Sequence, residues 1–438
     1  MSDEGTRTVP LAQDGVPVRA IRVEVVSGPD AGEWHGADTD VLGVGTAAAN
    51  DLVLTDRTVS RFHLELRRQG DRILVVDQGS TNGTAVGGAV LLASSALVRP
   101  GTVVEIGQSR LRVDDGRVVM ETRGPKALGG LRGGSEPMRR LMATIEKVAA
   151  TDVPVMILGE SGTGKELAAR AIHDLGAAAD APFVTIDCGS LSPTLFASEL
   201  FGHEKGAFTG ADRRRAGAFE RAVGGTVFLD EVGELLPELQ ASLLGVLERR
   251  RVRRLGGNDE IPVDARLVCA THRDLRAEVN AGTFRLDLYY RIAVVRLLTP
   301  PLRDRPDDVP LLVEHFLREA GHEGTVETLF PGDAIARLQR HPWPGNVREL
   351  RNVVLGTLAL GRTPELDAVP ETHLGDDPIE RALHLPYREA RAALTDRFER
   401  RYLTALLDRT AGNIRAAARE ARMDRSYLME LLKRHGMR

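Results

Sequence analysis

The chain has 438 residues, a hydrophobic share of 42%, a charged share of 27% and a formal net charge of −4. This length suits two to four globular domains. The small net charge gives no overall attraction to nucleic acid or to a membrane surface, so any basic surface must be local. Cys188 and Cys269 lie in apolar, strand-like runs without metal-ligand or redox spacing, which favours buried free thiols. Because the N-terminus is polar and the apolar runs are short, we expect a cytoplasmic protein without a signal peptide or membrane span.

The first segment, residues 18–115, consists of short apolar runs separated by turns. Runs at 21–26, 62–66 and 73–76 are divided by turn residues such as Gly70-Asp71 and Asn82-Gly83. This spacing predicts an all-β sandwich. The following residues, 116–130, lead into a glycine-rich stretch, for which we expect a flexible linker.

The central segment, residues 131–361, alternates apolar strands with helical patterns. Ser135 and Pro137 are typical of a helix start, as N-cap and first-turn residue. Strand-like runs follow at 154–158, 183–186, 226–229 and 266–270. The alternation predicts an α/β domain around a mostly parallel sheet.

A phosphate-binding loop follows the first of these strands. In this motif, glycines allow backbone N–H groups to point at phosphate oxygens, and a lysine neutralises the outer phosphates. A helical pattern at 167–172 supplies the expected strand–loop–helix context. Glu166 stands where the generic motif has the Ser or Thr that helps to hold magnesium, so the metal must depend on other ligands. The expected nucleotide-binding residues are Gly159, Glu160, Ser161, Gly162, Thr163, Gly164, Lys165 and Glu166.

An acidic pair, Asp230-Glu231, directly follows the strand at 226–229. Ligands of open α/β folds bind at the carboxyl edge of the sheet, where this pair is expected to lie. We expect Asp230 to hold Mg²⁺, directly or through water, and Glu231 to polarise the water that attacks ATP. Arg285 and Arg291 are candidates for a positive charge supplied to a neighbouring subunit's γ-phosphate.

Together these blocks resemble the central AAA+ domain of the sigma-54-dependent transcriptional activators, the bacterial enhancer-binding proteins. The resemblance covers residues 131–360 and includes the Lys165-Glu166 ending of the phosphate loop, which is usual in that family. It implies an AAA+ fold with a helical lid, ATP hydrolysis with Lys165, Asp230 and Glu231 in the catalytic site, and a ring, most simply a hexamer. The roles that it implies are a first sensor at Thr271 and His272, arginine fingers at Arg285 and Arg291, and a second sensor at Arg348.

A glycine-flanked loop and an aspartate suggest how the ATPase is coupled to its partner. The loop Gly206-Ala207-Phe208-Thr209-Gly210-Ala211 is predicted to be a mobile hairpin with an exposed Phe208 and Thr209 at its tip. The resemblance implies that this loop contacts the sigma factor. Asp187 stands where the family often has an Asn that restrains the catalytic glutamate, and an Asp near Glu231 would repel it unless one carboxyl is protonated.

The N-terminal sandwich resembles a forkhead-associated domain, a phosphothreonine-binding module, in its segments at 50–54, 59–63 and 79–84. Thr46 stands where that family usually has an arginine that contacts the phosphopeptide. Phosphothreonine recognition is the first interpretation, with input from a Ser/Thr kinase, and a phosphate-independent protein contact is the alternative. The residues that the resemblance assigns to the phosphopeptide site are Ser60, Arg61, His63, Thr81 and Asn82.

The chain ends in a basic tail. After a Pro-, Asp- and Gly-rich linker at 362–385, residues 386–438 hold thirteen Lys and Arg against seven Asp and Glu, a net charge of +6. Helical patterns at 387–407, 414–422 and 425–435 resemble a Fis-type helix-turn-helix, the first of them serving for dimerisation. Leu428, Leu431 and Leu432 face inward by spacing. The candidates for DNA contact are Arg425, Ser426, Tyr427, Met429 and Lys433.

These features predict a three-domain activator that binds enhancer-like DNA and remodels the closed complex of sigma-54 RNA polymerase with ATP and Mg²⁺. Two alternatives are an AAA+ ATPase that remodels another protein and a DNA-bound scaffold that uses nucleotide only for assembly. The intact catalytic residues argue against the scaffold. The loop at 206–211 and the basic tail argue against an unfoldase.

Overall fold

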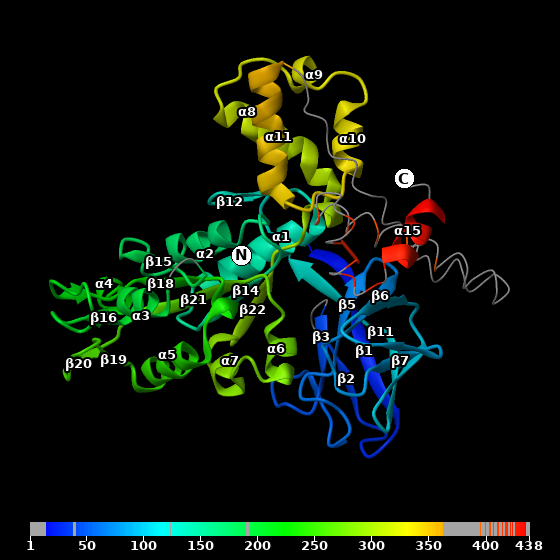
Figure 1. Cartoon of the computed structure of the whole chain (residues 1–438), viewed down its shortest axis with the longest axis horizontal. Helices are drawn as coiled ribbons and strands as arrows, with labels where there is room; N and C mark the ends of the chain where they lie inside the picture. Colours follow the sequence, from blue (N-terminus) through cyan, green and yellow to red (C-terminus); the bar gives the residue numbers. More distant parts are fainter. Residues whose placement is uncertain are drawn as a thin grey trace, which may run out of the picture. The chain divides into compact units, whose positions relative to one another are not determined.

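The computed structural model describes residues 15–37, 41–122, 124–189, 192–361 and 425–434, together with single residues between 395 and 423. The chain divides into two compact units, Met1–Pro364 and Glu365–Arg438, each of which is described by itself. The first unit contains a β-sandwich (residues 15–122) and an α/β domain (residues 124–361) with a helical lid (Figure 1).

The sandwich has two facing sheets, as the alternating apolar runs predict. The core lies between them, because alternate residues of each strand point inward, as Ile73 and Val75 do from β6. The first sheet runs in the spatial order β2 (Trp34–Gly36), β1 (Gly15–Ser27), β11 (Ser109–Thr122), β10 (Thr102–Ile106), β7 (Thr84–Val86) and β8 (Ala89–Leu91). The second runs β4 (Leu52–Val53), β3 (Val41–Gly45), β5 (Leu64–Gln69), β6 (Arg72–Asp77) and β9 (Ser95–Val98).

The expected flexible linker at 116–130 is wrong in its first half. Strand β11 continues to Thr122 and pairs antiparallel with β1 as far as Gly15. The extension contains the run Val118-Val119-Met120, whose β-branched and apolar side chains favour a strand. The second half holds the short hairpin β12 (Ala127–Leu128) and β13 (Leu131–Arg132). The connection between the two domains is therefore largely hydrogen-bonded structure.

The α/β domain is built on a five-stranded parallel sheet. Each predicted strand is present, and the sheet gains an unpredicted edge strand, β22 (Val295–Leu298), beside β14. The strands lie in the order β15 (Phe183–Asp187), β18 (Thr226–Asp230), β21 (Arg266–Thr271), β14 (Val155–Leu158) and β22. Because all strands are parallel, their carboxyl ends meet at one edge of the sheet.

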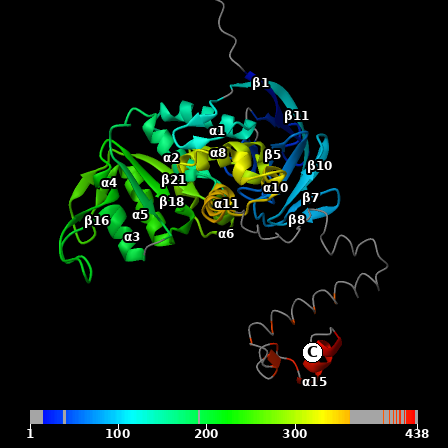
Figure 2. The same cartoon turned by 90° about the horizontal axis from the view of Figure 1, so that it is seen from above.

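Helices cover both faces of this sheet (Figures 1 and 2). One apolar cluster joins α1 (Glu136–Ala149) and α2 (Lys165–Asp174) to β14 and β21. The other face carries α3 (Pro193–Phe201), α4 (Ala218–Arg221), α5 (Pro237–Arg249), α6 (Leu275–Ala281) and α7 (Leu286–Ile292). Helix α1 begins after Ser135, as predicted, but the Ser135 hydroxyl donates to Asp308 instead of capping the helix.

The lid follows the sheet and contains α8 (Val309–Glu319), α9 (Val326–Leu329), α10 (Ala334–Arg340) and α11 (Asn346–Leu360). Helix α8 packs against both α10 and α11. Trp343 is fully buried and anchors the turn before α11 through its indole N–H, which donates to the Leu338 carbonyl. Within the part of the chain that the structure describes, no helix has the length and apolar character needed to cross a bilayer.

In the second unit, the structure describes one continuous helix, α15 (Arg425–Arg434). Leu428, Leu431 and Leu432 are buried on one face of α15, as the spacing predicts, and pack with Leu403 and Leu406. The predicted linker at 362–385 lies outside the described residues, as do the helices expected at 387–407 and 414–422 apart from single positions.

Candidate functional site

The loop between β14 and α2 has the geometry of a phosphate-binding loop. Gly164 takes a positive φ of 104° immediately before α2, a conformation that side-chain-bearing residues rarely adopt. At Gly162, a Cβ atom would lie 2.4 Å from the Gly345 carbonyl oxygen, so the close approach of the lid requires glycine there. The buried Thr163 hydroxyl lies 2.8 Å from that of Thr299 and donates to the Glu160 carbonyl. The neighbouring residues thus fix the loop, and its position at the start of a helix makes its N–H groups available to bind an anion.

Lys165 begins α2 with its side chain only 8% exposed. Its ammonium group donates to the Gly159 carbonyl oxygen at 3.0 Å. It also lies 3.3 Å from Oε1 of Glu231, which forms an ion pair across the carboxyl edge of the sheet. The amine is therefore held against the loop, next to the carboxylate that the sequence assigns to catalysis.

Asp230 and Glu231 end β18 at this edge. Burial and the charge of Glu231 raise the pKa of Asp230, although Lys165 opposes the shift. The Asp230 carboxylate also accepts the N–H of Glu231 at 3.1 Å. Glu231 adopts a left-handed backbone conformation, with φ of 54°, which is uncommon for a residue with a side chain and occurs at functional sites.

The partner that holds Glu231 is His272, the residue after β21. Oε2 of Glu231 accepts the His272 backbone N–H at 3.1 Å and lies 2.7 Å from its Nδ1. Burial raises the pKa of Glu231, but these two hydrogen bonds and the Lys165 charge outweigh burial, so the net shift is downward. Thr271 is fully buried, and its carbonyl accepts the N–H of Gly159. The end of β21 therefore contacts both the phosphate loop and the acidic pair.

Asp187 ends β15 at the same sheet edge, next to Asp230. It pairs in register with Asp230 through the backbone, and its Oδ1 accepts the Gly189 N–H at 2.9 Å. Its charge contributes to the raised pKa of Asp230, whereas it is not among the leading causes of the shift at Glu231. The expected repulsion therefore acts on Asp230.

The lid closes over the phosphate loop from α11. Arg348 donates to the Ser161 hydroxyl at 2.9 Å. Asn346, fully buried and with φ of 53°, donates to the Ser161 carbonyl and to Glu160. Arg303 binds both carboxylate oxygens of Glu160, at 2.6 and 2.8 Å. The sequence predicted Arg348 at this site but missed Asn346 and Arg303. For Asn346, the Trp-Pro-Gly-Asn turn is the available signal in the sequence.

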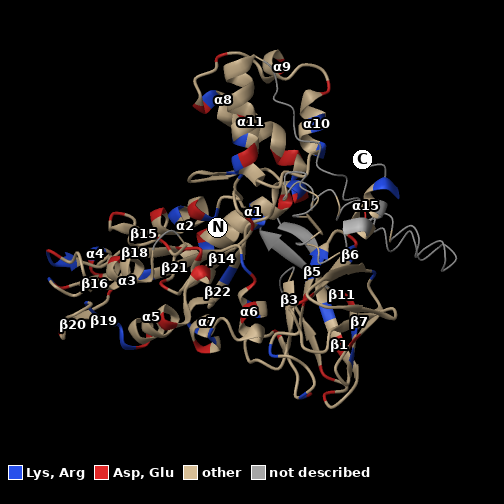
Figure 3. Ribbon diagram, in the orientation of Figure 1, with Lys and Arg blue, Asp and Glu red and all other residues tan. Residues whose placement is uncertain are grey.

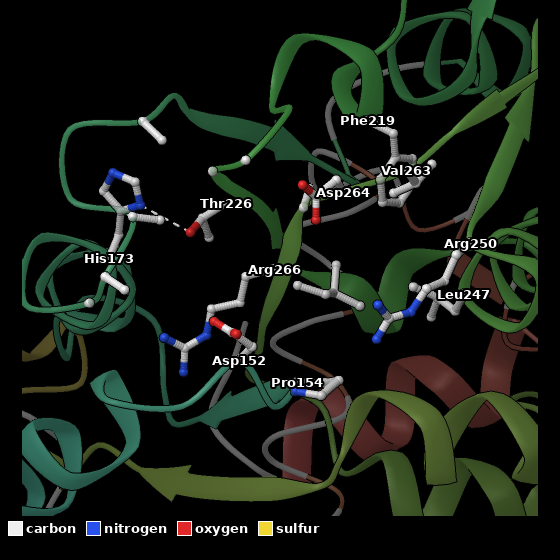
Figure 4. A pocket seen from close by; sticks show the side chains of 18 of the residues that line it. Asp152, Pro154, His173, Phe219, Thr226, Leu247, Arg250, Val263, Asp264 and Arg266 are labelled. Atoms are coloured by element: carbon white, nitrogen blue, oxygen red, sulfur yellow. Dashed lines mark hydrogen bonds between the residues drawn. The ribbon is translucent and has the colours of Figure 1, made fainter.

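Arg285 and Arg291 are not brought to this site. Arg285 forms an exposed ion pair with Asp287. Arg291 ends α7 and lines a cavity of about 820 Å³ at the amino edge of the sheet, together with Pro154, Thr226 and Arg266 (Figure 4). These three residues stand immediately before or at the start of strands, so the cavity lies at the edge opposite to the phosphate loop. Arg291 therefore has no route to the phosphates of its own subunit.

The loop Gly206–Ala211 is a closed hairpin, but the predicted exposure of Phe208 is wrong. The Gly206 N–H donates to the Ala211 carbonyl at 2.8 Å, and Gly206 and Gly210 both have positive φ. Phe208 is half-buried because its ring packs edge-on against His203, with the ring centroids 5.0 Å apart. Thr209 is the exposed side chain at the tip.

The base of this loop is anchored by a buried arginine. Arg254, 8% exposed, pairs with Glu204 at 2.8 Å and with Glu220. The hydrogen bonds that Arg254 donates to Glu220 raise the pKa of Arg254, which therefore stays charged. The hairpin rises from a fixed platform, so movement of its tip need not disturb the sheet.

The carboxylates at the sheet edge fit a hard divalent cation. Asp230 offers oxygen ligands whose ionised form is disfavoured by burial and by Glu231, and a cation would relieve that repulsion. No cluster of three or more His, Cys, Asp and Glu ligands exists among the residues whose placement is described. This pattern suits a metal bound by one or two carboxylates together with phosphate oxygens, which is the usual binding mode of Mg²⁺.

Comparison with known proteins agrees with this geometry. Residues 131–298 match the sigma-54 interaction domain, and residues 303–381 match the AAA+ ATPase lid domain. The transcriptional regulatory protein ZraR of Salmonella typhimurium is 45% identical over 306 residues, which span 70% of this chain and 68% of ZraR. The chain belongs to the sigma-54-dependent transcriptional activators. Its central domain is an AAA+ ATPase.

Other relatives are similar over the same part of this activator. GlrR of Escherichia coli is 46% identical over 302 residues, 68% of this chain and 66% of GlrR. The crystal structure of NtrX from Brucella abortus in complex with ATP has 40% identity and a TM-score of 0.50, covering 71% of this chain and 70% of that one. Residues 24–116 match the cytoplasmic domain of an inner membrane component of the T3SS.

The sandwich of the activator places its predicted phosphopeptide residues on one edge. The Ser60 hydroxyl accepts the Thr81 N–H at 3.0 Å, and Asn82 donates to the Thr58 carbonyl at 2.8 Å. His63 is fully buried and supports the loop, accepting the Ser60 N–H at Nδ1 while Nε2 lies 3.1 Å from the Gly83 carbonyl. Burial lowers the pKa of His63, which keeps the ring neutral.

Two positions on this edge differ from a free phosphopeptide site. Thr46 occupies the place of the usual arginine, and its N–H donates to the Ser60 carbonyl at 3.1 Å. Arg61 is an exposed residue, yet its guanidinium donates to the Val279 carbonyl in the α/β domain. The described geometry therefore brings Ser60, Thr81 and Asn82 together but directs Arg61 toward the ATPase.

On α15, Tyr427 is half exposed and Lys433 is exposed, whereas Met429 is partly buried. Arg425 and Ser426 form the first turn of the helix, and their side chains lie outside the described set. The predicted DNA-contacting residues thus share one short helix, in which Leu428, Leu431 and Leu432 form a buried apolar face.

Proposed function

We propose that this activator binds enhancer-like DNA through its C-terminal helices and uses ATP hydrolysis to remodel the closed complex of sigma-54 RNA polymerase. The observation that carries the proposal is the convergence of Lys165, Asp230, Glu231 and His272 at one sheet edge, with the Gly206–Ala211 hairpin on a fixed platform. A cytoplasmic location follows from this proposal, because polymerase and promoter DNA lie there.

In the proposed reaction, backbone N–H groups of the phosphate loop and Lys165 bind the phosphates of ATP. Asp230, together with phosphate oxygens, would hold Mg²⁺, which when bound would neutralise phosphate charge. Glu231 orients water for attack, since its lowered pKa keeps the carboxylate ionised and able to accept a hydrogen bond. Thr271 and His272 connect that carboxylate to β21, and Arg348 reports lid closure through Ser161.

Arg285 and Arg291 would act on the site of a neighbouring subunit, which requires a ring, most simply a hexamer. Their exposure and their distance from the phosphate loop of their own subunit support action in trans, since a guanidinium near the γ-phosphate stabilises the charge that develops there. The hexamer also places several hairpins around one axis, where they can engage a single sigma factor.

We further propose that the sandwich receives a phosphothreonine signal from a Ser/Thr kinase or a phosphorylated protein. Ser60, Arg61, Thr81 and Asn82 offer hydroxyl, guanidinium and amide donors, which suit a phosphate with nearly two negative charges. His63 would keep the Ser60 loop in place. In the C-terminal unit, Arg425, Ser426, Tyr427, Met429 and Lys433 are the proposed DNA contacts.

In vitro transcription from a sigma-54 promoter tests the main proposal. We expect Thr209→Ala to lose open-complex formation while it retains ATPase activity within about twofold, because Thr209 lies at the exposed hairpin tip and away from the nucleotide residues. Thr144→Ala is the matched control: Thr144 is exposed on α1 and its hydroxyl donates within its own helix. Equal transcription from the wild type and Thr209→Ala would refute the sigma-factor assignment.

A further inference from the structure

The sandwich and the ATPase domain of the first unit share an apolar contact. Phe62, in the loop before β5, is fully buried and belongs to the same apolar cluster as Leu275 and Val279 of α6. Its ring meets Tyr289 of α7 edge-on, with ring centroids 5.1 Å apart. An apolar ring of this size beside a recognition loop is typical of a contact surface. Here the surface that it contacts is the ATPase domain.

A buried charge cluster joins the two domains at the same place. Oε2 of Glu65, on β5, lies 2.9 Å from Arg276 of α6 and 3.2 Å from Arg296 of β22. Figure 3 marks the acidic and basic positions along the ribbon, on which β5, α6 and β22 are labelled. Glu65 and Arg276 are 7% and 5% exposed. A buried charge is costly without its partner, and in this pair each domain supplies one partner. The cluster therefore fixes where the two domains meet, because each buried charge needs its partner from the other domain in that place.

The third element of the contact is the recognition edge itself. The Arg61 guanidinium donates to the carbonyls of Val279 and Asn280 at the end of α6. In return, the Asn280 amide donates to the carbonyls of Phe62 and Gln78 and accepts the Phe62 N–H. The loop that carries Ser60 and Arg61 is thus tied to α6 by hydrogen bonds from both sides.

We propose that phosphothreonine binding and docking of the sandwich on α6 exclude one another, because both use Arg61. This inference rests on the phosphothreonine recognition proposed above. A phosphate beside Ser60 and Thr81 offers the guanidinium a dianionic partner, whereas docking offers it two neutral carbonyls. Both sets of hydrogen bonds have a charged donor, but a phosphate adds a charged acceptor and can bind the guanidinium through two parallel N–H groups, so the ligand draws Arg61 away from Val279.

Undocking acts on two functional segments of the ATPase. Helix α6 begins shortly after His272, the residue that holds Glu231; Arg285 immediately precedes α7 and Arg291 lies in it. In the docked form both helices are held by Arg276, whose Nε donates to the Tyr289 hydroxyl at 3.0 Å while Nη1 binds Glu65. Release of the sandwich frees α6 and α7 to take the positions that hydrolysis between subunits requires. The docked form is therefore the restrained one.

Asn280→Ala in the full-length chain tests the exclusion. The substitution removes hydrogen bonds that serve docking only, and Asn280 contacts none of Ser60, Thr81 or Asn82. The probe is a phosphothreonine peptide library with its unphosphorylated counterpart. We expect the variant to bind the phosphorylated library roughly tenfold more tightly than the wild type, since each lost hydrogen bond weakens docking by a factor of about 2–12. Its ATPase activity without peptide should approach that of the peptide-saturated wild type.

Arg61→Ala separates the two roles of the arginine. It should lose peptide affinity and also show the raised, peptide-independent ATPase activity, because both uses of the guanidinium are removed. Arg110→Ala, which removes an exposed arginine paired with Glu105 on the first sheet, is the matched control and should behave as the wild type. Hydrogen exchange along α6 should increase when the phosphorylated library binds the wild type and should not respond to the plain library.

The outcomes separate this inference from the function on which it rests. Equal phosphopeptide affinity in the wild type and Asn280→Ala, with no change in ATPase activity, overturns the exclusion and leaves phosphothreonine recognition intact. Absence of selective binding in both proteins overturns phosphothreonine recognition and the exclusion with it. Tighter binding by Asn280→Ala together with lower ATPase activity overturns the restraining role of the docked form.

Discussion

Replacing Glu65 by Gln should cost about 3 kcal/mol of unfolding free energy at neutral pH. Glu65 is almost fully buried among Arg67, Arg276 and Arg296, and the amide would leave their charge uncompensated. Breaking a buried ion pair by removing one partner typically costs about 3–5 kcal/mol. The direct comparison variant is Glu105→Gln, whose ion pair is about half exposed and should contribute less than about 1 kcal/mol.

The pKa of Glu65 leads to the same magnitude. Burial would raise it, but Arg67, Arg276 and Arg296 lower it from 4.5 to about 2. A fall of this size corresponds to about 3 kcal/mol of stability that depends on the ionised carboxylate. Because the folded-state pKa is depressed, this contribution is fully present above pH 4.5 and is lost as the pH falls toward about 2.

Urea unfolding at several pH values measures both effects. The difference in unfolding free energy between the wild type and Glu65→Gln should reach its full size at neutral pH. It should become smaller below pH 4.5, as the wild-type carboxylate gains its proton. Hydrogen exchange along α6 shows whether the variant stays docked with a destabilised interface or separates so that water reaches Arg276. A difference below about 1 kcal/mol at neutral pH, similar to that of Glu105→Gln, would refute the assignment of a buried charge cluster.

Three further outcomes concern catalysis. His272→Ala should shift the acid limb of the ATPase pH profile to higher pH, because the ring hydrogen bond that lowers the pKa of Glu231 is lost while burial, which raises it, remains. An unmoved limb would exclude Glu231 as the titrating base. Lys165→Ala and Arg291→Ala should each be inactive alone but regain ATPase activity on mixing, since a mixed ring pairs an intact phosphate loop with an intact finger. A mixture that remains inactive would argue against action in trans. Asp187→Asn should keep ATPase activity within about twofold, because the charge of Asp187 contributes to the raised pKa of Asp230 and not to the leading causes of the shift at Glu231; a tenfold change would favour direct coupling to Glu231.

The nucleotide site is largely predictable from the sequence because its signals are local. Lys165 and the loop glycines follow one hydrophobic strand, and Asp230-Glu231 directly follow another, so the parallel sheet brings them to one edge. Asn346 was missed because its contribution depends on a turn that presents its amide to the Ser161 carbonyl, and a carbonyl has no side-chain signature.

The regulatory contacts are less predictable, since they join distant segments or use the backbone. Arg61 and Val279 are 218 positions apart, and Arg61 binds a main-chain carbonyl that any residue could supply. The burial of Phe208 could not be predicted for a different reason. The flanking glycines predict a hairpin, but the contact of Phe208 with His203 depends on the path that the hairpin takes. The predicted sandwich ends at residue 115, before the true end of β11, because the prediction assigns Val118 and Val119 to the linker together with the glycine-rich stretch that follows.

The position of α6 explains why a signal at the sandwich can reach the catalytic carboxylate without a long series of contacts. Arg276 binds Glu65 near the start of the helix, and Asp274 caps that start by accepting the Arg276 N–H at 3.0 Å. His272 lies just before the cap and holds Glu231. His272 and Arg276 therefore lie on either side of one hydrogen-bonded helix start. In the coupling that we propose, release of Arg276 from Glu65 acts on Glu231 through this short segment and His272.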